Sequence, residues 1–151
     1  MNAKRWLSVF GLAAILFHAT GASADDEGRP FDNGSIRGSY GFSFSGSVLV
    51  PIPGQSTPIQ VLVAAVGRFV SDGNGSITEG SRTISINGSA VLQIFECTYQ
   101  VQSDGTGTAS CPVFETGTTE TFSVVLNTHA KELNFVATSP GTIVVGTAKK
   151  Q

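Results

Sequence analysis

Charged residues are scarce in this chain, and the basic ones do not cluster. Only 13% of the 151 residues are charged, whereas 18 are glycine. Low charge with much Gly, Ser, Thr and Val is typical of β-structure with many turns rather than of helices. Two of the nine Lys and Arg residues, Lys4 and Arg5, belong to the leader described below. The rest of the chain has seven basic and eleven acidic residues, which is a net charge of −4. This balance argues against nucleic acid and against an anionic membrane surface as partners.

Long hydrophobic runs are also missing, apart from one that is too short to span a membrane. The 12-residue apolar run Trp6–Phe17 follows Lys4-Arg5 and precedes the small-residue sequence Ala22-Ser23-Ala24. A membrane span needs about 20 apolar residues. We therefore expect residues 1–24 to be a signal peptide cut after Ala24, with general secretory export to the periplasm or the outside and no membrane span in the mature form. No cysteine follows the run, so a lipoprotein anchor is excluded.

Tryptophan, methionine and histidine are almost absent from the mature chain. Trp6, Met1 and His18 all lie in the leader, which leaves His129 as the only mature histidine. A single turn histidine with no second His or Cys ligand does not indicate a metal site, and no Ser or Cys nucleophile stands out beside it. We expect no metal, no cofactor and no catalytic set.

One turn has a superficial likeness to a calcium loop. Asp72, Asn74 and Ser76 stand at alternate positions, as in the first half of such a loop. The second half would need Gly at position 77 and a bidentate Glu at position 83, where Ile77 and Thr83 stand. A turn built from Asp, Asn and Gly is the better interpretation.

Apolar and polar residues alternate along most of the mature chain with the period of two that marks half-buried strands. After a flexible N-terminal arm at residues 25–35, residues 36–151 are expected to form a single domain. The expected strands are Ile36–Val50, Ile59–Val70, Ile77–Ile86, Val91–Gln102, Thr106–Phe114, Thr119–Asn127, Glu132–Thr138 and Thr142–Ala148. The first is too long to be flat, so we expect a bend near Gly41 or Gly46.

Most of these strands are joined by short turns, which indicates an up-and-down meander. An open meander leaves two exposed edges, and closure removes them. We predict an all-β fold, an eight-stranded antiparallel up-and-down β-barrel, with a β-sandwich as the alternative. An outer-membrane barrel is disfavoured, because the mature chain offers only Tyr40 and Tyr99 for an aromatic girdle and ends on Lys149-Lys150-Gln151.

Four segments carry a resemblance to a known group of proteins. They begin at Gly38 (GSYGFSF), Ala65 (AVGRFVSDGNG), Thr98 (TYQVQSDGTGT) and Ser139 (SPGTIVVGTAK). They resemble uncharacterised small exported bacterial proteins, which in turn resemble the allene-oxide-cyclase and dirigent type of calycin-like barrel. The resemblance implies a fold; its motifs are turns and strand patterns, and it implies no catalytic residue.

The two cysteines are predicted to form a disulfide. Export implies an oxidising compartment, in which two cysteines usually pair. If Ser103-Asp104-Gly105 is a three-residue turn, Cys97 stands opposite Cys111, with Val101 opposite Gly107, Tyr99 opposite Ala109 and Phe95 opposite Val113. Every partner on that face is apolar or small. Two free buried thiols are the alternative.

Aromatic residues recur at the inward positions of the expected strands. Their simplest interpretation is a packed core. They are also the candidate lining of a ligand cavity, because an eight-stranded barrel is either filled or holds one small ligand. The candidates are Tyr40, Phe42, Phe44, Phe69, Phe95, Tyr99, Phe122 and Phe135.

The second strand is apolar on both sides. Leu62, Ala64 and Val66 should face outward, where a solvated strand would be polar. By parity we also place Val125 and Val144 outward. Such a patch usually marks an interface, so we expect a dimer or trimer. The alternative is that the arm at residues 25–34 or the loop at residues 51–58 covers the patch.

Three classes of function stay open at this point. The chain is a binding module for a small apolar ligand, a structural or interaction protein of the cell envelope, or a cyclase- or isomerase-like enzyme. The last rests on fold analogy alone.

Overall fold

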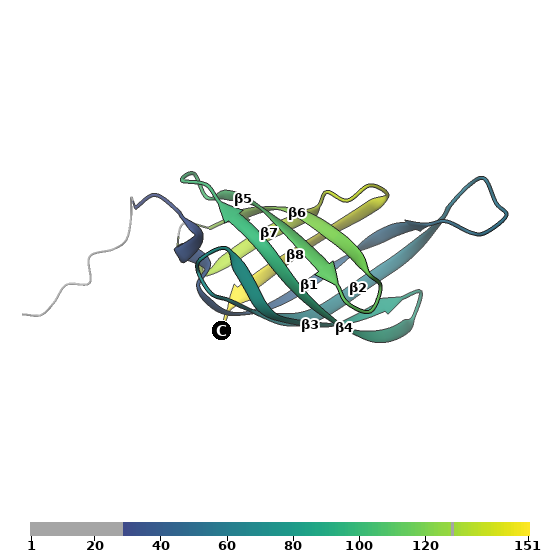
Figure 1. Cartoon of the computed structure of the whole chain (residues 1–151), viewed down its shortest axis with the longest axis horizontal. Helices are drawn as coiled ribbons and strands as arrows, with labels where there is room; N and C mark the ends of the chain where they lie inside the picture. The colour runs from purple at the N-terminus through teal and green to yellow at the C-terminus, as the bar shows by residue number, and fades with distance from the viewer. Residues whose placement is uncertain (1–28, 128) are drawn as a thin grey trace, which may run out of the picture.

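The computed structural model describes residues 29–127 and 129–151, which form a closed barrel of eight antiparallel strands (Figure 1). Each strand pairs with the next, and the last pairs with the first. This confirms the predicted up-and-down barrel. The predicted leader, its cleavage site and residues 25–28 lie outside the described residues. The strands are β1 (Gly38–Val50), β2 (Ile59–Ser71), β3 (Ser76–Ile86), β4 (Ser89–Val101), β5 (Thr106–Val113), β6 (Thr118–Leu126), β7 (Glu132–Ala137) and β8 (Thr142–Lys150).

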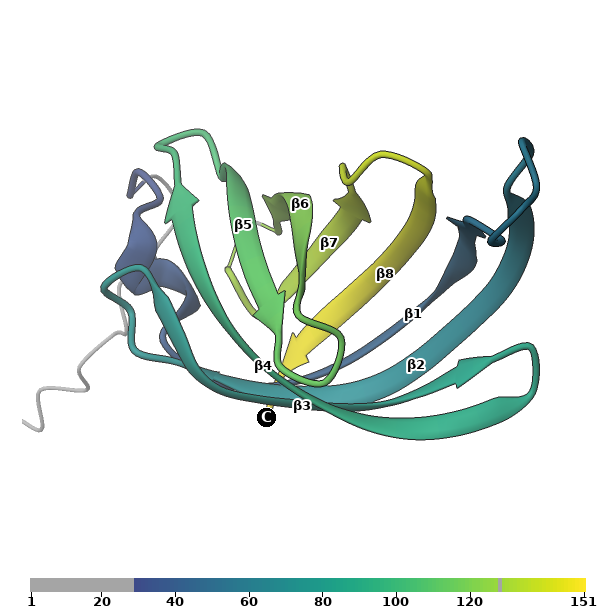
Figure 2. The same ribbon diagram turned by 45° about the vertical axis from the view of Figure 1, so that its right-hand side comes forward.

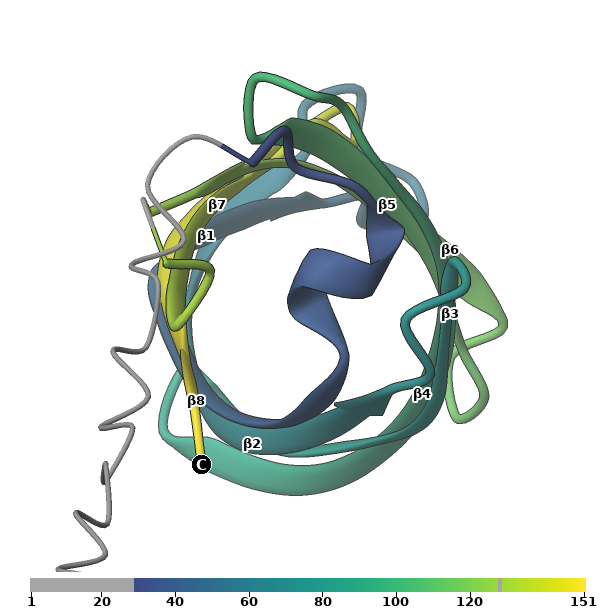
Figure 3. The ribbon, with the colours of Figure 1, turned by 90° about the vertical axis from the view of Figure 1, so that its left-hand side faces the viewer.

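A short 3-10 helix, η1 (Asn33–Ile36), lies across one end of the barrel, which we call the closed end (Figure 3). Asp32 caps it, because its carboxylate accepts from the Ser35 amide at 3.0 Å. The Asn33 side chain accepts from the Val101 amide at 2.8 Å, which ties η1 to β4. Ile36, expected as the first strand residue, is instead the buried last residue of η1.

The opposite end, which we call the open end, carries the long β1–β2 loop at residues 51–58 and the Asn87-Gly88 turn between β3 and β4. Figure 2 shows both hairpins extending beyond the rest of the barrel. No helix within the described ranges is long and apolar enough to cross a membrane.

Glycines on the inward face make room for aromatic rings. A Cβ atom at Gly80 would overlap the Phe95 ring, and one at Gly146 would overlap the Phe135 ring. Small barrels fill their interior by alternating small and large residues in this way.

The bend expected in β1 does not interrupt its pairing with β2. The two strands pair along the whole length of β1 without a bulge.

The β4–β5 hairpin has the predicted register. Phe95 faces Val113, Tyr99 faces Ala109 and Val101 faces Gly107. The Sγ atoms of Cys97 and Cys111 are 2.01 Å apart, so the predicted disulfide is present. It lies in the buried cluster that fills the closed half of the barrel.

The outward positions of β2 are exposed as expected, with Leu62 at 68% and Val66 at 63%. The placement of Val144 on the outer face was wrong. Val144 is 4% exposed and stands opposite Gly46 on the inward face of β1. Because Ile143, Val144 and Val145 are all apolar, alternation within β8 does not assign a face, and the register with β1 decides it.

Candidate functional site

The interior of the barrel contains a cavity of about 90 Å³. Seven of the eight aromatic candidates line it, namely Phe42, Phe44, Phe69, Phe95, Tyr99, Phe122 and Phe135. The rings also pack on one another: the Phe42 centroid is 6.0 Å from that of Phe69 and 5.9 Å from that of Phe95. The interior is therefore an aromatic core that retains a small apolar space.

The eighth candidate, Tyr40, belongs to the closed end and does not border this cavity. Its side chain is fully buried, stacks on Phe69 with ring centroids 5.1 Å apart, and donates a hydrogen bond to the Ala130 carbonyl at 2.9 Å. Burial, and then the proximity of Tyr99, raise the pKa of the Tyr40 hydroxyl to about 12. Tyr40 therefore stays protonated and holds the hairpin between β6 and β7 against β1.

This raised pKa makes the stability of the barrel sensitive to alkali. The folded-state pKa of Tyr40 is above the unfolded value of 10.0, so its contribution is complete below pH 10 and is lost as pH rises towards 12. We expect the free energy of unfolding, measured by urea titration, to fall across this interval. In Tyr40→Phe the slope over the same interval should be shallower. Equal slopes in the two proteins would contradict this assignment.

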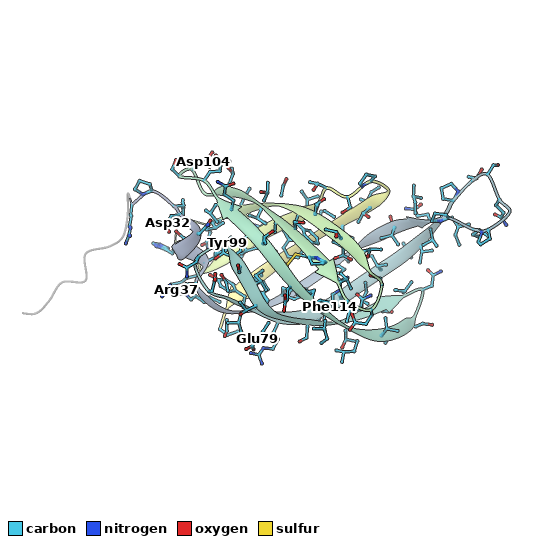
Figure 4. All side chains as sticks on the ribbon, in the orientation of Figure 1. Asp32, Arg37, Glu79, Tyr99, Asp104 and Phe114 are labelled. Atoms are coloured by element: carbon cyan, nitrogen blue, oxygen red, sulfur yellow. A yellow bond between two sulfur atoms is a disulfide. The ribbon has the colours of Figure 1, made fainter. Side chains whose placement is uncertain are left out.

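Tyr99 joins the cavity wall to η1. Its hydroxyl lies 2.7 Å from Ser71 Oγ and donates to the Asn33 carbonyl at 3.1 Å. Figure 4 labels Tyr99, Asp32 and Arg37 in the same part of the molecule, at the closed end. The wall of the cavity and the segment that closes the barrel are thus one connected unit.

A charged residue, Arg82 of β3, projects into this aromatic interior and is only 5% exposed. Its two terminal nitrogens donate to the two carboxylate oxygens of Glu120, both at 2.6 Å. Its Nε donates to the side-chain oxygen of Gln93 at 2.8 Å. The guanidinium carbon also lies over the rings of Phe44 and Phe95, 5.4 and 5.9 Å from their centroids. Arg82 therefore has a carboxylate, an amide and two aromatic faces as partners.

Strand pairing brings these polar residues together. Arg82 and Gln93 are direct partners on β3 and β4. Arg82 also stands opposite Gly67 of β2, where the lack of a side chain makes room for the Phe42 ring. Glu120 approaches from β6, two residues before the inward-facing Phe122. We call Arg82, Gln93 and Glu120 the polar cluster.

Sequence reasoning missed the polar cluster because β3 contains a bulge. The register shifts between Ile77 and Gly80, so Ile77 and Arg82 both face inward although they are five positions apart. Simple alternation from Ile77 places Arg82 outside. Gln93, in contrast, has the same parity as Phe95 and Cys97, and this signal was available from the sequence.

One member of the polar cluster, Glu120, lies between two cavities. A second cavity of about 50 Å³ lies towards the open end, between Val48, Val63 and Val144 among others, and Glu120 borders both cavities. No buried side-chain nitrogen or oxygen in the described ranges lacks a partner. Because both Glu120 oxygens already accept from Arg82, the carboxylate is placed as an ion-pair partner rather than as a free base.

The remaining candidates lie in turns. The Asp72 carboxylate accepts from the amides of Asn74 and Ser76 at 2.7 and 3.0 Å, which lowers its pKa and stabilises the turn. His129 is exposed. Across residues 29–127 and 129–151, no group of three His, Cys, Asp or Glu side chains is placed to hold a metal ion.

Comparison with protein-family models, with curated proteins and with solved structures found no match to this chain. The strand pairing shows the barrel. No family, relative or fold neighbour supports the resemblance to allene-oxide-cyclase and dirigent proteins or to small exported bacterial proteins.

Proposed function

We propose that this protein binds a small, mainly apolar molecule inside the barrel, in the space beside the polar cluster. The observation that carries this proposal is an apolar cavity with a small number of polar groups at one side. This combination is typical of small-molecule sites. The aromatic lining supplies contact area, and Arg82, Glu120 and Tyr99 are the polar residues in the wall that can orient a ligand.

The volume limits the size of the ligand. An apolar cavity of about 150 Å³ takes up a benzene ring. The inner cavity of about 90 Å³ is smaller, and the second cavity adds about 50 Å³ on the other side of Glu120. Phe44 and Phe122 border both cavities as Glu120 does, so a small shift of these rings joins the two spaces and lets a ligand of roughly one ring fit.

Benzene is a suitable first probe of the cavity. A molecule that binds only the folded state raises the melting temperature in a saturable way. Ala109 borders the cavity, so the larger side chain of Ala109→Leu should fill it and abolish the rise. Ala90→Leu, the same change at an exposed position of β4, should leave the rise intact. Absence of any rise in the wild type, or an equal rise in Ala109→Leu, would refute the proposal.

Binding is favoured over the cyclase- or isomerase-like alternative by one contact. A general base must lie within hydrogen-bond reach of the proton that it takes from the substrate. Glu120, the carboxylate that lines both cavities, has Arg82 as the hydrogen-bond partner of both its oxygens. The enzymatic alternative has no comparable contact in its favour.

We also propose that the protein is exported by the general secretory route to the periplasm or the outside. The leader pattern at residues 4–24 and the disulfide between Cys97 and Cys111 support this, because such bonds persist in oxidising compartments. The intact mass of the protein from its own cells should correspond to a chain that begins at Asp25, two hydrogens lighter than its reduced form. A retained leader or two alkylatable thiols would contradict export.

We propose further that a second copy of the chain docks on the outer face of β2. No residue from Gly38 to Gly67 is charged, and Leu62 and Val66 are strongly exposed. A hollow without charged lining extends from this face across β1 to β6. Two copies with the same net charge can approach through this face, because no charged residue lines it. Charged residues such as Arg37 and Asp104 lie towards the closed end (Figure 4).

Neither segment expected to cover this face does so among the described residues. Phe31 packs at the closed end, where its amide donates to the Ser103 carbonyl at 3.2 Å, and the loop at residues 51–58 points away from the barrel (Figure 1).

A charge on the exposed face should therefore separate the copies. We expect Leu62→Asp to convert a dimer or trimer into a folded monomer in analytical ultracentrifugation, because it would place a carboxylate in an apolar interface. Thr108→Asp, at an exposed position of β5, should leave the assembly unchanged. A wild type that is monomeric at tens of micromolar would end this hypothesis.

A further inference from the structure

We infer that the ligand of the inner cavity is a monocarboxylate whose carboxylate replaces that of Glu120 on Arg82. The inference rests on the proposed function and deepens it, because it names the chemical class of the ligand. It follows from an asymmetry between the two halves of the ion pair.

Arg82 is the fixed half. Its side chain is 5% exposed, Gln93 holds its Nε, and the rings of Phe44 and Phe95 lie against its guanidinium. All of these contacts are independent of Glu120. The two terminal nitrogens would therefore keep their position and direction if the Glu120 carboxylate moved away.

Glu120 is the replaceable half. Its side chain is 31% exposed, and its only side-chain hydrogen bonds to other described residues are the two with Arg82. It stands near the start of β6, on the side of the inner cavity that faces the open end, and borders both cavities. A Glu120 side chain released from Arg82 can reach water there, and its departure joins the two cavities into one space.

The exchange conserves charge inside the barrel. One carboxylate leaves the guanidinium and another takes its place in the same bidentate geometry, which suits arginine and carboxylate. A dicarboxylate would bring a second charge into the apolar lining, which is costly. The favoured ligand has one carboxylate and an apolar part of about one ring.

Benzoate, benzamide and benzene form a matched series for isothermal titration calorimetry on the wild-type protein with its disulfide intact. Benzamide has the shape of benzoate without its charge. We expect benzoate to bind about tenfold more tightly than benzamide, because benzoate keeps Arg82 paired while the released Glu120 carboxylate is hydrated, a gain of about one hydrogen bond to a charged group. In Arg82→Met this preference should disappear while benzene still binds.

Glu120→Gln removes the internal competitor. Benzoate should then bind about tenfold more tightly than to the wild type, and it should restore melting temperature that the substitution has lost. Glu96→Gln, the same change at an exposed position of β4, should alter neither property.

The outcomes separate this inference from the proposed function. If benzene binds but benzoate binds no better than benzamide, the inference fails and the proposed function stands. If none of the three binds, both fail. If Arg82→Met keeps the preference for benzoate, the inference is overturned. Should Glu120→Gln not fold, the comparison of benzoate with benzamide on the wild type decides alone.

Discussion

Glu120→Gln should lower the free energy of unfolding by about 3 kcal/mol at neutral pH. The substitution leaves the guanidinium of Arg82, only 5% exposed, without an anion. Breaking a buried pair by removing one partner costs about 3–5 kcal/mol. We take the lower end because Glu120 is 31% exposed and water reaches its side of the pair. Urea unfolding followed by far-ultraviolet circular dichroism measures the loss.

Two further variants identify the cause of this loss. Glu96→Gln removes an exposed carboxylate from β4 and should change stability by no more than about 0.5 kcal/mol. The double variant Arg82→Met/Glu120→Leu replaces both charges by apolar groups, so it should be more stable than Glu120→Gln, because no unpaired charge is left inside. A Glu120→Gln protein as stable as the wild type would show that the ion pair does not stabilise the fold.

Removing the disulfide should have an effect of similar size. Cys97 and Cys111 are 14 positions apart, and a loop of this length corresponds to about 3 kcal/mol in the chain-entropy model. We expect Cys97→Ala/Cys111→Ala to melt roughly 10 °C lower than the oxidised wild type. The far-ultraviolet spectrum should remain that of a β-protein, because the β4–β5 ladder holds the hairpin in register.

Reduction of the wild type provides the control for this prediction. Reduced wild type and the double alanine variant should melt within a few degrees of each other if the bond itself is responsible. A variant that melts at the temperature of the oxidised wild type would show that the bond does not stabilise the barrel. A spectrum without β-structure would show that the ladder alone does not preserve the hairpin.

The sequence predicted those features that local patterns determine. The turn at Ser103-Asp104-Gly105 fixes the β4–β5 register, and with it the pairing of the cysteines. Alternation placed the six candidate phenylalanines inside, because each of their strands keeps its parity around them. Eight strands with short turns then favoured closure over an open meander.

The features that local patterns could not predict depend on neighbouring strands. The bulge between Ile77 and Gly80 changes the parity of β3 and turns Arg82 inward. The register of β8 with β1 decides the side on which Val144 lies. The position of η1 depends on contacts with Val101 and Tyr99, which are distant in sequence.

The pairing of β1 with β8 has a consequence for the order of folding. In this ladder Tyr40 stands opposite Lys150, so closure joins residues that are far apart along the chain. Contacts of such long range form slowly, because a large loop must close before they contribute. A nascent chain therefore carries β1 as an unpaired edge until β8 has been synthesised. Truncation before β8 leaves the edges of β1 and β7 open to strands of other chains. Closure of the barrel without aggregation therefore depends on the final strand.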